Sequence, residues 1–267
     1  MATVAIEKLS RLQNIITDCQ SVVVAFSGGV DSALLLKVAV DTLGDKVMAV
    51  TLRSMINPPG EVDEALLLAG AIDVKHVIID FDPLKDEEFV SNPSLRCYYC
   101  KKKIMGLVLE LARGQGYRHV LDGVNADDTG DYRPGMRAVR ELGVKSPLLE
   151  AGLTKAEIRE LSRRMGLPTS EKPSAACLAS RFPYGTRITV EALQKVAAAE
   201  VFLRNKGYTQ VRVRNHGDLA RIEVPGAEIT DLLMDKVIIA TKLKELGFIY
   251  VTIDLQGYRT GSMNETL

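Results

Sequence analysis

Short apolar runs alternate with amphipathic stretches of helical periodicity through the first half of the chain. Runs rich in β-branched residues predict buried parallel strands at residues 22–26, 47–52, 74–79 and 119–122. The stretches between them predict helices at residues 32–43, 61–70 and 99–115. Strands that alternate with helices indicate an α/β fold, a doubly wound parallel sheet whose ligand site lies at the carboxyl ends of its strands.

The pattern changes in the C-terminal third. A helix predicted over residues 155–165 begins at Thr154, an N-cap with Glu157 in the capping-box position, and ends before a Gly-Leu-Pro stop signal. A loop of residues 169–187 follows it. Beyond the loop we predict helices at residues 190–206 and 231–245, and strands at residues 210–214, 220–224 and 250–255. This order indicates a small α+β domain with an antiparallel hairpin, so we divide the chain into domains of residues 1–182 and 183–267.

Composition narrows the class of protein. The chain has 267 residues, 46% of them hydrophobic and 25% charged, and its 34 basic residues balance 34 acidic ones. It therefore has no overall positive field to gather nucleic acid, and we expect no nucleic-acid partner. No apolar run reaches membrane-spanning length, and the N-terminal stretch is typical of an amphipathic helix, not of a signal peptide. We expect a cytoplasmic enzyme that binds no membrane.

The sequence SGGVDS, residues 27–32, joins the first predicted strand to the first predicted helix. Two glycines allow a tight turn, and N–H donors at a helix N-terminus bind phosphate. No lysine follows at the position that a mononucleotide P-loop requires. The hexapeptide instead resembles the loop of the PP-loop ATP pyrophosphatases. This resemblance implies that ATP is cut between its α- and β-phosphates, and that Ser27, Gly28, Gly29, Asp31 and Ser32 bind it.

Polar residues at the ends of the other strands extend this ATP site. Arg53 follows the second strand, and Asp122 and Gly123 follow the fourth. Asp31 is the first candidate to contact Mg²⁺ or the reacting phosphate; alternatively, it is an acidic residue that the helix dipole favours. Asp127, Asp128 and Asp131 form an acidic cluster that either assists Mg²⁺ or belongs to a solvated loop.

The cysteines suggest a second chemistry. Cys97 and Cys100 form a CxxC pair, which alone fits a zinc half-site, a redox dithiol or, less well in the cytoplasm, a disulfide. Cys177, in a loop of small residues, adds a third thiolate, whereas Cys19 ends the first helix and is expected to be a buried small hydrophobe. Three thiolates leave one position open on zinc or on a four-iron cluster. The histidines fall in or beside predicted strands and turns, where a structural role is favoured: His76, His119 and His216.

Several segments together resemble the LarE family of ATP-dependent sulfur transferases, which make the nickel-pincer nucleotide cofactor. Besides SGGVDS they are CYYCKKK, LDGVNADDTGDYRPGMRA, KPSAACLASRFPYGT, VRVRNHGDLARIE and GYRTGSMNETL. The resemblance implies a pyridinium-3,5-biscarboxylic acid mononucleotide as substrate, adenylation of its carboxylates with ATP and Mg²⁺, and displacement of AMP by sulfur. It also implies a sulfide source and a homo-oligomer, with a hexamer as the form that the family suggests. The first domain then binds ATP, and the second domain binds the substrate and mediates oligomerisation.

Members of that family are of two kinds. In one, a single cysteine gives up its own sulfur and becomes dehydroalanine; in the other, three cysteines carry a 4Fe–4S cluster. This chain is similar to the second kind, which implies that Cys97, Cys100 and Cys177 are cluster ligands and that Cys177 is catalytic.

Arg212 and Arg214 alternate with valines, so both project from one face of a predicted strand. They form either a phosphate clamp or an ordinary charged surface. The resemblance implies a substrate-phosphate site that these two arginines share with Ser180 and Asp231. Its weaker candidates are Arg181, Glu200 and Arg259.

Other function classes remain open. A PP-loop tRNA thiolase would need a basic RNA-binding surface or further zinc motifs, and the sequence shows neither. An ammonia-using PP-loop synthetase has no use for three grouped cysteines. A nucleotide-binding module without catalysis is disfavoured by a resemblance that covers the whole chain.

Overall fold

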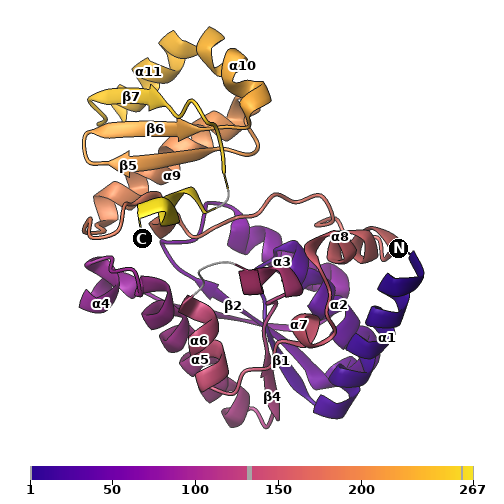
Figure 1. Ribbon diagram of the computed structural model, residues 1–267. Coiled ribbons are helices and arrows are strands. Elements are labelled where there is room, and N and C mark those ends of the chain that lie inside the picture. Colours follow the sequence, from indigo (N-terminus) through magenta and orange to yellow (C-terminus); the bar gives the residue numbers. More distant parts are fainter. Residues whose placement is uncertain (1, 131–133, 260, 267) are drawn as a thin grey trace. The chain divides into compact units, whose positions relative to one another are not determined.

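A computed structural model describes residues 2–130, 134–259 and 261–266 of the chain (Figure 1). The chain forms two compact units. The first comprises Met1–Ser54, Gly60–Phe81 and Cys97–Ser174, and the second comprises Met55–Pro59, Asp82–Arg96 and Ala175–Leu267. The main chain thus enters the second unit for the last time after Ser174. The domain boundary after residue 182 stays a prediction.

The first unit is built on a parallel sheet with the strand order β3-β2-β1-β4. Its strands are β1 (Val22–Ala25), β2 (Val47–Arg53), β3 (Lys75–Asp80) and β4 (His119–Leu121). In the register of the sheet, Val22 lies between Val47 of β2 and His119 of β4. The predicted α/β class and its four strands are therefore confirmed.

Helices cover both faces of this sheet, and the alternation along β1 explains why. Val22 and Val24 belong to a core shared with α1, α2, α3, α7 and α8, whereas Val23 belongs to a separate core shared with α5 and α6 (Figure 1). Successive side chains of a strand point to opposite faces, so every position of β1 is apolar. The helices are α1 (Ala2–Cys19), α2 (Val30–Leu43), α3 (Glu61–Ile72), α5 (Arg96–Gly114), α6 (Pro134–Glu141), α7 (Pro147–Glu150) and α8 (Lys155–Arg164).

The predicted capping box of α8 is confirmed. The Glu157 N–H donates to Thr154 Oγ1 at 3.4 Å, and the Thr154 N–H donates to Glu157 Oε2 at 2.8 Å. Lys8 of α1 donates to the same glutamate at 2.7 Å, which ties the first helix to the start of α8. Among the helices of the described ranges, none is long and apolar enough to cross a membrane.

The second unit holds a three-stranded sheet with the order β5-β6-β7. Strands β5 (Arg212–His216) and β6 (Leu219–Glu223) form the predicted antiparallel hairpin, and β7 (Tyr250–Ile253) pairs parallel with β6. Its helices are α4 (Glu87–Val90), α9 (Val190–Asn205), α10 (Ile229–Met234) and α11 (Lys236–Glu245).

The single helix predicted over residues 231–245 is wrong, because the chain breaks it into α10 and α11 at Asp235. The Asp235 carboxylate accepts a hydrogen bond from the Tyr208 hydroxyl at 3.4 Å and pairs with Lys206 at 3.0 Å. Aspartate is a weak helix former, so these contacts suffice to favour the break.

Candidate functional site

The segment of residues 27–32 forms a tight loop that its own hydroxyl groups close. Ser32 Oγ lies 3.1 Å from Ser27 Oγ, accepts the Ser27 N–H at 3.3 Å and donates to the Gly29 carbonyl at 3.1 Å. The loop leads directly into α2, so the unpaired N–H groups of that helix start and the positive end of its dipole lie at the loop. This is the geometry of an anion-binding site.

Two glycines let other elements approach the loop closely. Gly28 has a φ of +71°, and a Cβ at this position would lie 3.0 Å from Ala65 Cβ of α3. A Cβ at Gly123, after β4, would lie 3.2 Å from the Ser32 backbone nitrogen. A side chain at either position would displace the loop, so close packing explains both glycines, and Gly123 as a nucleotide contact stays a prediction.

Asp31 lies at the start of α2 with both carboxylate oxygens engaged. Oδ2 pairs with Lys155 Nζ at 2.5 Å, and Oδ1 accepts from Asn125 Nδ2 at 3.2 Å. Lys155 is the first residue of α8, and Asn125 follows β4. Asp31 therefore joins three elements at the carboxyl edge of the sheet. The sequence analysis missed both partners, although the N-cap Thr154 marks where Lys155 stands.

Asp122, directly after β4, is 1% exposed, and hydrogen bonds reach one of its two carboxylate oxygens. Its Oδ1 accepts from the Ser146 hydroxyl at 2.7 Å and from the Val124 N–H at 3.3 Å. Its Oδ2 is buried and has no hydrogen-bond partner among the described residues. A buried carboxylate oxygen without a donor is costly, and a cation beside it removes that cost. Hard carboxylate oxygens are also the donors that Mg²⁺ prefers, so the residues at this edge fit that ion.

Asp127 and Asp128 accept backbone hydrogen bonds at the start of α8 and in their own loop. Asp127 Oδ2 accepts the N–H of Lys155 at 2.8 Å, and Asp128 Oδ2 accepts the N–H of Asn125 at 3.0 Å. These contacts give both carboxylates a structural role that the sequence analysis did not consider, and Mg²⁺ binding by the cluster stays a prediction. Asp131 lies outside the described residues.

The end of β2 shows two different environments. Arg53 is exposed and makes a two-pronged ion pair with Asp80 of β3, at 2.6 and 3.0 Å. Thr51 is buried, and its hydroxyl donates to the Phe26 carbonyl at 2.7 Å and lies 2.8 Å from His76 Nε2. Burial lowers the pKa of His76, so this ring is neutral at pH 7. His76 and Thr51 thus support the strand before the phosphate loop, and Arg53 as a nucleotide contact stays a prediction.

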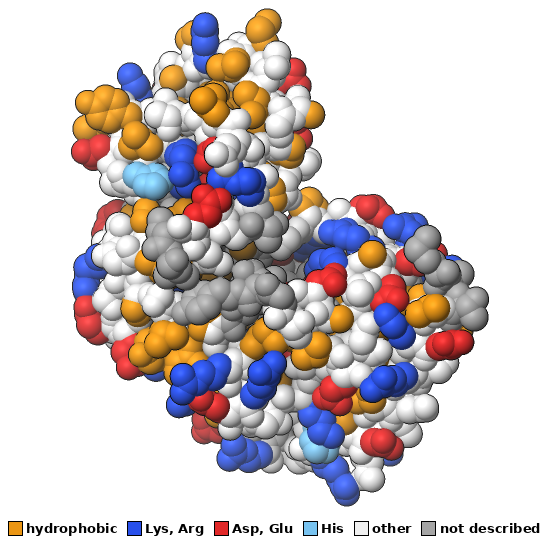
Figure 2. Space-filling view, in the orientation of Figure 1, with side chains coloured by type: hydrophobic (Ala, Val, Ile, Leu, Met, Phe, Trp, Pro, Cys, Tyr) orange, Lys and Arg blue, Asp and Glu red, His pale blue; other side chains and the backbone are white. Residues whose placement is uncertain are grey.

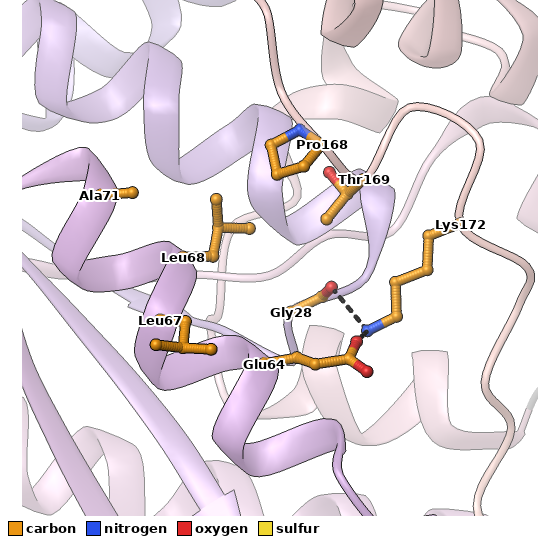
Figure 3. Close-up of a pocket in the computed structure, with 8 residues that line it drawn as sticks. All are labelled: Gly28, Glu64, Leu67, Leu68, Ala71, Pro168, Thr169 and Lys172. Atoms are coloured by element: carbon orange, nitrogen blue, oxygen red, sulfur yellow. Dashed lines mark hydrogen bonds and ion pairs between the residues drawn. The ribbon is translucent and has the colours of Figure 1, made fainter.

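Lys172 is a further residue at this loop that the sequence analysis missed. Its Nζ donates to the Gly28 carbonyl at 3.2 Å and pairs with Glu64 at 2.8 Å (Figure 3). It also pairs with Glu61 at 2.7 Å. Burial lowers the pKa of Lys172, but the hydrogen bonds to the two glutamates outweigh it, and the pKa lies above its usual value. The lysine is therefore a fixed positive charge beside the loop.

A pocket of about 540 Å³ adjoins Lys172 and Gly28. Leu67, Leu68 and Ala71 of α3 form one wall, and the segment from Pro168 to Lys172 forms the other (Figure 3).

The cysteines occupy both units. Cys97 is exposed and Cys100 half-buried; they lie three residues apart near the start of α5, and therefore on one face of that helix. Cys177 is exposed and precedes a short 3₁₀ turn, Leu178–Arg181, in the second unit. None of the four cysteines is in a disulfide, and Cys19 is buried in the core as expected.

The donor types suit an iron–sulfur cluster, since thiolates are its usual ligands. Within the described ranges, however, no group of three His, Cys, Asp or Glu side chains is arranged to hold a metal ion. The three-thiolate site stays a prediction.

Arg181 anchors the turn that follows Cys177. Its guanidinium donates to Glu200 of α9 at 2.7 and 3.0 Å, to the Cys177 carbonyl at 3.2 Å and to the Ser180 hydroxyl at 2.8 Å. Both members of the ion pair are buried, with side chains 1% and 0% exposed. Burial raises the pKa of Glu200, but the hydrogen bonds and charge of Arg181, together with the Val213 N–H and the charge of Arg212, lower it more, so the pKa is lowered overall. Arg181 and Glu200 thus position the Cys177 segment.

Arg212 and Arg214 of β5 are buried, which contradicts the charged-surface interpretation. Arg214 donates to Glu223 at 2.9 and 2.6 Å and to the Ser180 carbonyl at 2.9 Å. Arg212 donates to the Val211 carbonyl at 2.8 Å and lies 5.2 Å from the centre of the Tyr258 ring. Burial and then the charge of Arg181 lower the pKa of Arg212, so an anion there would stabilise its charged form.

The remaining candidates for the substrate-phosphate site lie near the surface. Arg259 pairs with Glu265 at 3.1 Å, and Asp231 is exposed on α10. The described contacts bring Arg181, Arg214 and Ser180 together, and the roles of Asp231 and Arg259 stay predictions.

The segment that contains the phosphate loop, and the chain as a whole, are similar to known proteins. The family model of NAD synthase matches residues 7–92. The pyridinium-3,5-bisthiocarboxylic acid mononucleotide synthase of Lactiplantibacillus plantarum is 42% identical over 268 residues, covering 100% of this chain and 97% of the relative. An uncharacterized protein of Synechocystis is 42% identical over 97% of this chain and 98% of its own. The tRNA-specific 2-thiouridylase of Moorella thermoacetica is 29% identical over 65% of this chain and 60% of its own.

Proposed function

Because the chain belongs to the LarE family of PP-loop sulfur transferases, we propose that it makes pyridinium-3,5-bisthiocarboxylic acid mononucleotide from the corresponding biscarboxylic acid. The observation that carries the proposal is the closed phosphate loop of residues 27–32, in a chain 42% identical over its full length to a synthase of that name. The enzyme uses ATP because a carboxylate is a poor electrophile until one oxygen becomes part of a leaving group.

In the first step a substrate carboxylate oxygen attacks the α-phosphorus of ATP. An acyl–AMP bond forms, the α–β phosphoanhydride bond breaks, and pyrophosphate leaves. The Gly29 N–H, the serine hydroxyls and the start of α2 bind the β- and γ-phosphates, so they stabilise the charge of the leaving pyrophosphate. Asp122, whose Oδ2 has no partner among the described residues, would hold Mg²⁺, and Asp31 would join it by giving up its contact with Lys155 or Asn125; the ion would neutralise phosphate charge when bound.

In the second step a sulfur nucleophile attacks the acyl carbon. A C–S bond forms, the C–O bond to AMP breaks, and a thiocarboxylate and AMP result. Lys155, paired with Asp31 at 2.5 Å, places a positive charge near the departing nucleotide phosphate. Cys97, Cys100 and Cys177 would hold a 4Fe–4S cluster, and the chemistry it would supply when bound is delivery of an exogenous sulfide. Arg181 fixes the backbone at Cys177, and so fixes the position of that thiol within its own unit.

The substrate's own phosphate is assigned to the arginines of β5. Arg212 is 5% exposed, and both burial and the neighbouring Arg181 disfavour its charge. A phosphate dianion beside Arg212 relieves both effects, because a charge-assisted hydrogen bond compensates for lost hydration. Arg214 is already paired with Glu223 and contributes mainly by holding Ser180.

Assembly with a second copy of this chain is proposed through an apolar surface on α10 and α11. Leu233, Met234, Val237 and Ile238 are between 49% and 84% exposed. Figure 2 shows hydrophobic side chains gathered over this part of the second unit. Such a patch is typical of a protein interface. A Val237→Glu variant should therefore lower the mass found by light scattering after size-exclusion chromatography, whereas Lys242→Glu on the same helix should not.

The test is product analysis with the purified chain, ATP, Mg²⁺, sulfide and the pyridinium substrate under anaerobic conditions. We expect AMP and pyrophosphate by chromatography, and a mass gain of about 16 Da for each oxygen replaced by sulfur. Iron analysis and multiple turnovers test the cluster, with Cys19→Ser as control because Cys19 is buried in the core. Formation of ADP would contradict the PP-loop assignment. A single turnover with dehydroalanine at residue 177 would contradict the cluster but not the synthase.

A further inference from the structure

We propose that Lys172 is a positioning residue that orients the backbone of the phosphate loop so that the loop binds pyrophosphate. It holds the Gly28 carbonyl on one side of the loop, so that the next N–H, that of Gly29, points to the other side. The inference rests on the proposed function, because it assumes that this loop binds the β- and γ-phosphates of ATP.

The geometry of the peptide bond links the two groups. In a trans peptide the carbonyl of one residue and the N–H of the next point in opposite directions. The Gly28 carbonyl accepts from Lys172 Nζ at 3.2 Å, and the Gly29 N–H faces Ser27 Oγ at 3.4 Å, within the loop. A 3.4 Å contact is long for a hydrogen bond, so this N–H is available to a stronger acceptor such as a phosphate oxygen.

Backbone freedom at Gly28 makes a holding group necessary. Glycine populates positive φ about as readily as negative φ, so the observed value of +71° is not imposed by the residue itself. The lysine contact selects one orientation of the peptide between Gly28 and Gly29.

The charge balance beside the loop supports the same role. The three N–H donors of the Lys172 ammonium match three acceptors: Glu61, and the Gly28 carbonyl and Glu64 that Figure 3 draws. Both glutamates lie in the first turn of α3. Loss of the lysine charge would leave two carboxylates without this partner next to a site for a polyphosphate, and the repulsion would come mainly from Glu61, whose side chain is only 18% exposed.

The test compares Lys172→Met, Lys172→Arg and Lys37→Met. Lys37 lies on α2 in an exposed ion pair with Asp41, so its variant controls for the loss of one lysine charge in the same unit. The ligands are α,β-methylene-ATP, pyrophosphate and AMP, with affinities from isothermal titration calorimetry. For Lys172→Met we expect affinity for the first two ligands to fall at least about tenfold, the equivalent of one lost charge-assisted contact, and affinity for AMP to change little. Arginine should restore part of the loss, and Lys37→Met should cause none.

Three results would overturn the inference. The ratio of α,β-methylene-ATP to AMP affinity could stay as in the wild type. All three ligands could weaken equally with a lower urea midpoint, which would show a role in folding. Lys37→Met could match Lys172→Met, which would show a general charge effect. A wild-type chain that binds AMP as tightly as α,β-methylene-ATP would instead contradict the proposed function itself.

Discussion

The buried ion pair between Arg181 and Glu200 gives a quantitative prediction. A methionine in place of Arg181 has an unbranched apolar chain but no donors, so the Glu200 carboxylate loses its contacts at 2.7 and 3.0 Å. It keeps the Val213 N–H at 3.0 Å and Arg204 at 3.4 Å. Removing one partner of a buried pair costs about 3–5 kcal/mol, and the remaining contacts place the expected loss near the lower end. About 3 kcal/mol lowers the folding equilibrium constant roughly a hundredfold.

The assay is urea unfolding followed by circular dichroism. The double variant Arg181→Met/Glu200→Leu should recover part of the lost stability, because it removes the unpaired carboxylate but leaves the Val213 N–H without its acceptor. Arg187→Met is the matched control, since Arg187 pairs with Glu87 at an exposed site and should cost at most about 1 kcal/mol. The reasoning is refuted if Arg181→Met costs no more than this control, or if the double variant is no more stable than the single one.

Three further predictions concern the loop, acid stability and the substrate phosphate. Gly28→Ala should cost about 1–2 kcal/mol of stability in urea and abolish calorimetric ATP binding, whereas Gly143→Ala, with a similar φ but no atom within 4 Å of the added Cβ, should cost only the stability. Because burial lowers the pKa of His76, the unfolded chain binds more protons than the folded chain. The free energy of unfolding should therefore fall as the pH drops from about 6.5 through the native pKa of His76. The variant His76→Gln should reduce the difference between the urea midpoints measured at about pH 7.5 and about pH 5. Arg212→Met should weaken binding of the pyridinium mononucleotide at least about tenfold in calorimetry, with ATP binding unchanged; equal losses would assign Arg212 to the fold.

Local patterns account for what could be predicted of the fold. The apolar run at β1 reflects burial on both faces, and the capping box at Thr154 is a contact within one turn. Both features therefore depend on residues that are adjacent in the sequence. The break at Asp235 was missed because it depends on Tyr208 and Lys206, which lie far back along the chain. Tertiary contacts override helix propensity there.

The same distinction applies to the site. The phosphate loop lies within six adjacent residues and could be predicted from its motif. Lys155 contacts Asp31 across 124 positions of sequence, and Lys172 contacts Gly28 across 144, so no local pattern indicated either contact. The alternation in β5 correctly placed two arginines on one face, but their burial depends on elements elsewhere in the second unit.

The central claim is that a substrate carboxylate is adenylated before sulfur replaces its oxygen. It is tested most directly with a pyridinium substrate whose carboxylate oxygens are ¹⁸O, incubated with the enzyme, unlabelled ATP, Mg²⁺ and sulfide. Attack of the carboxylate on the α-phosphorus transfers one labelled oxygen to each AMP, so mass spectrometry should find AMP heavier by about 2 Da and pyrophosphate unlabelled. AMP without the label, formed together with the thiocarboxylate, would contradict the account.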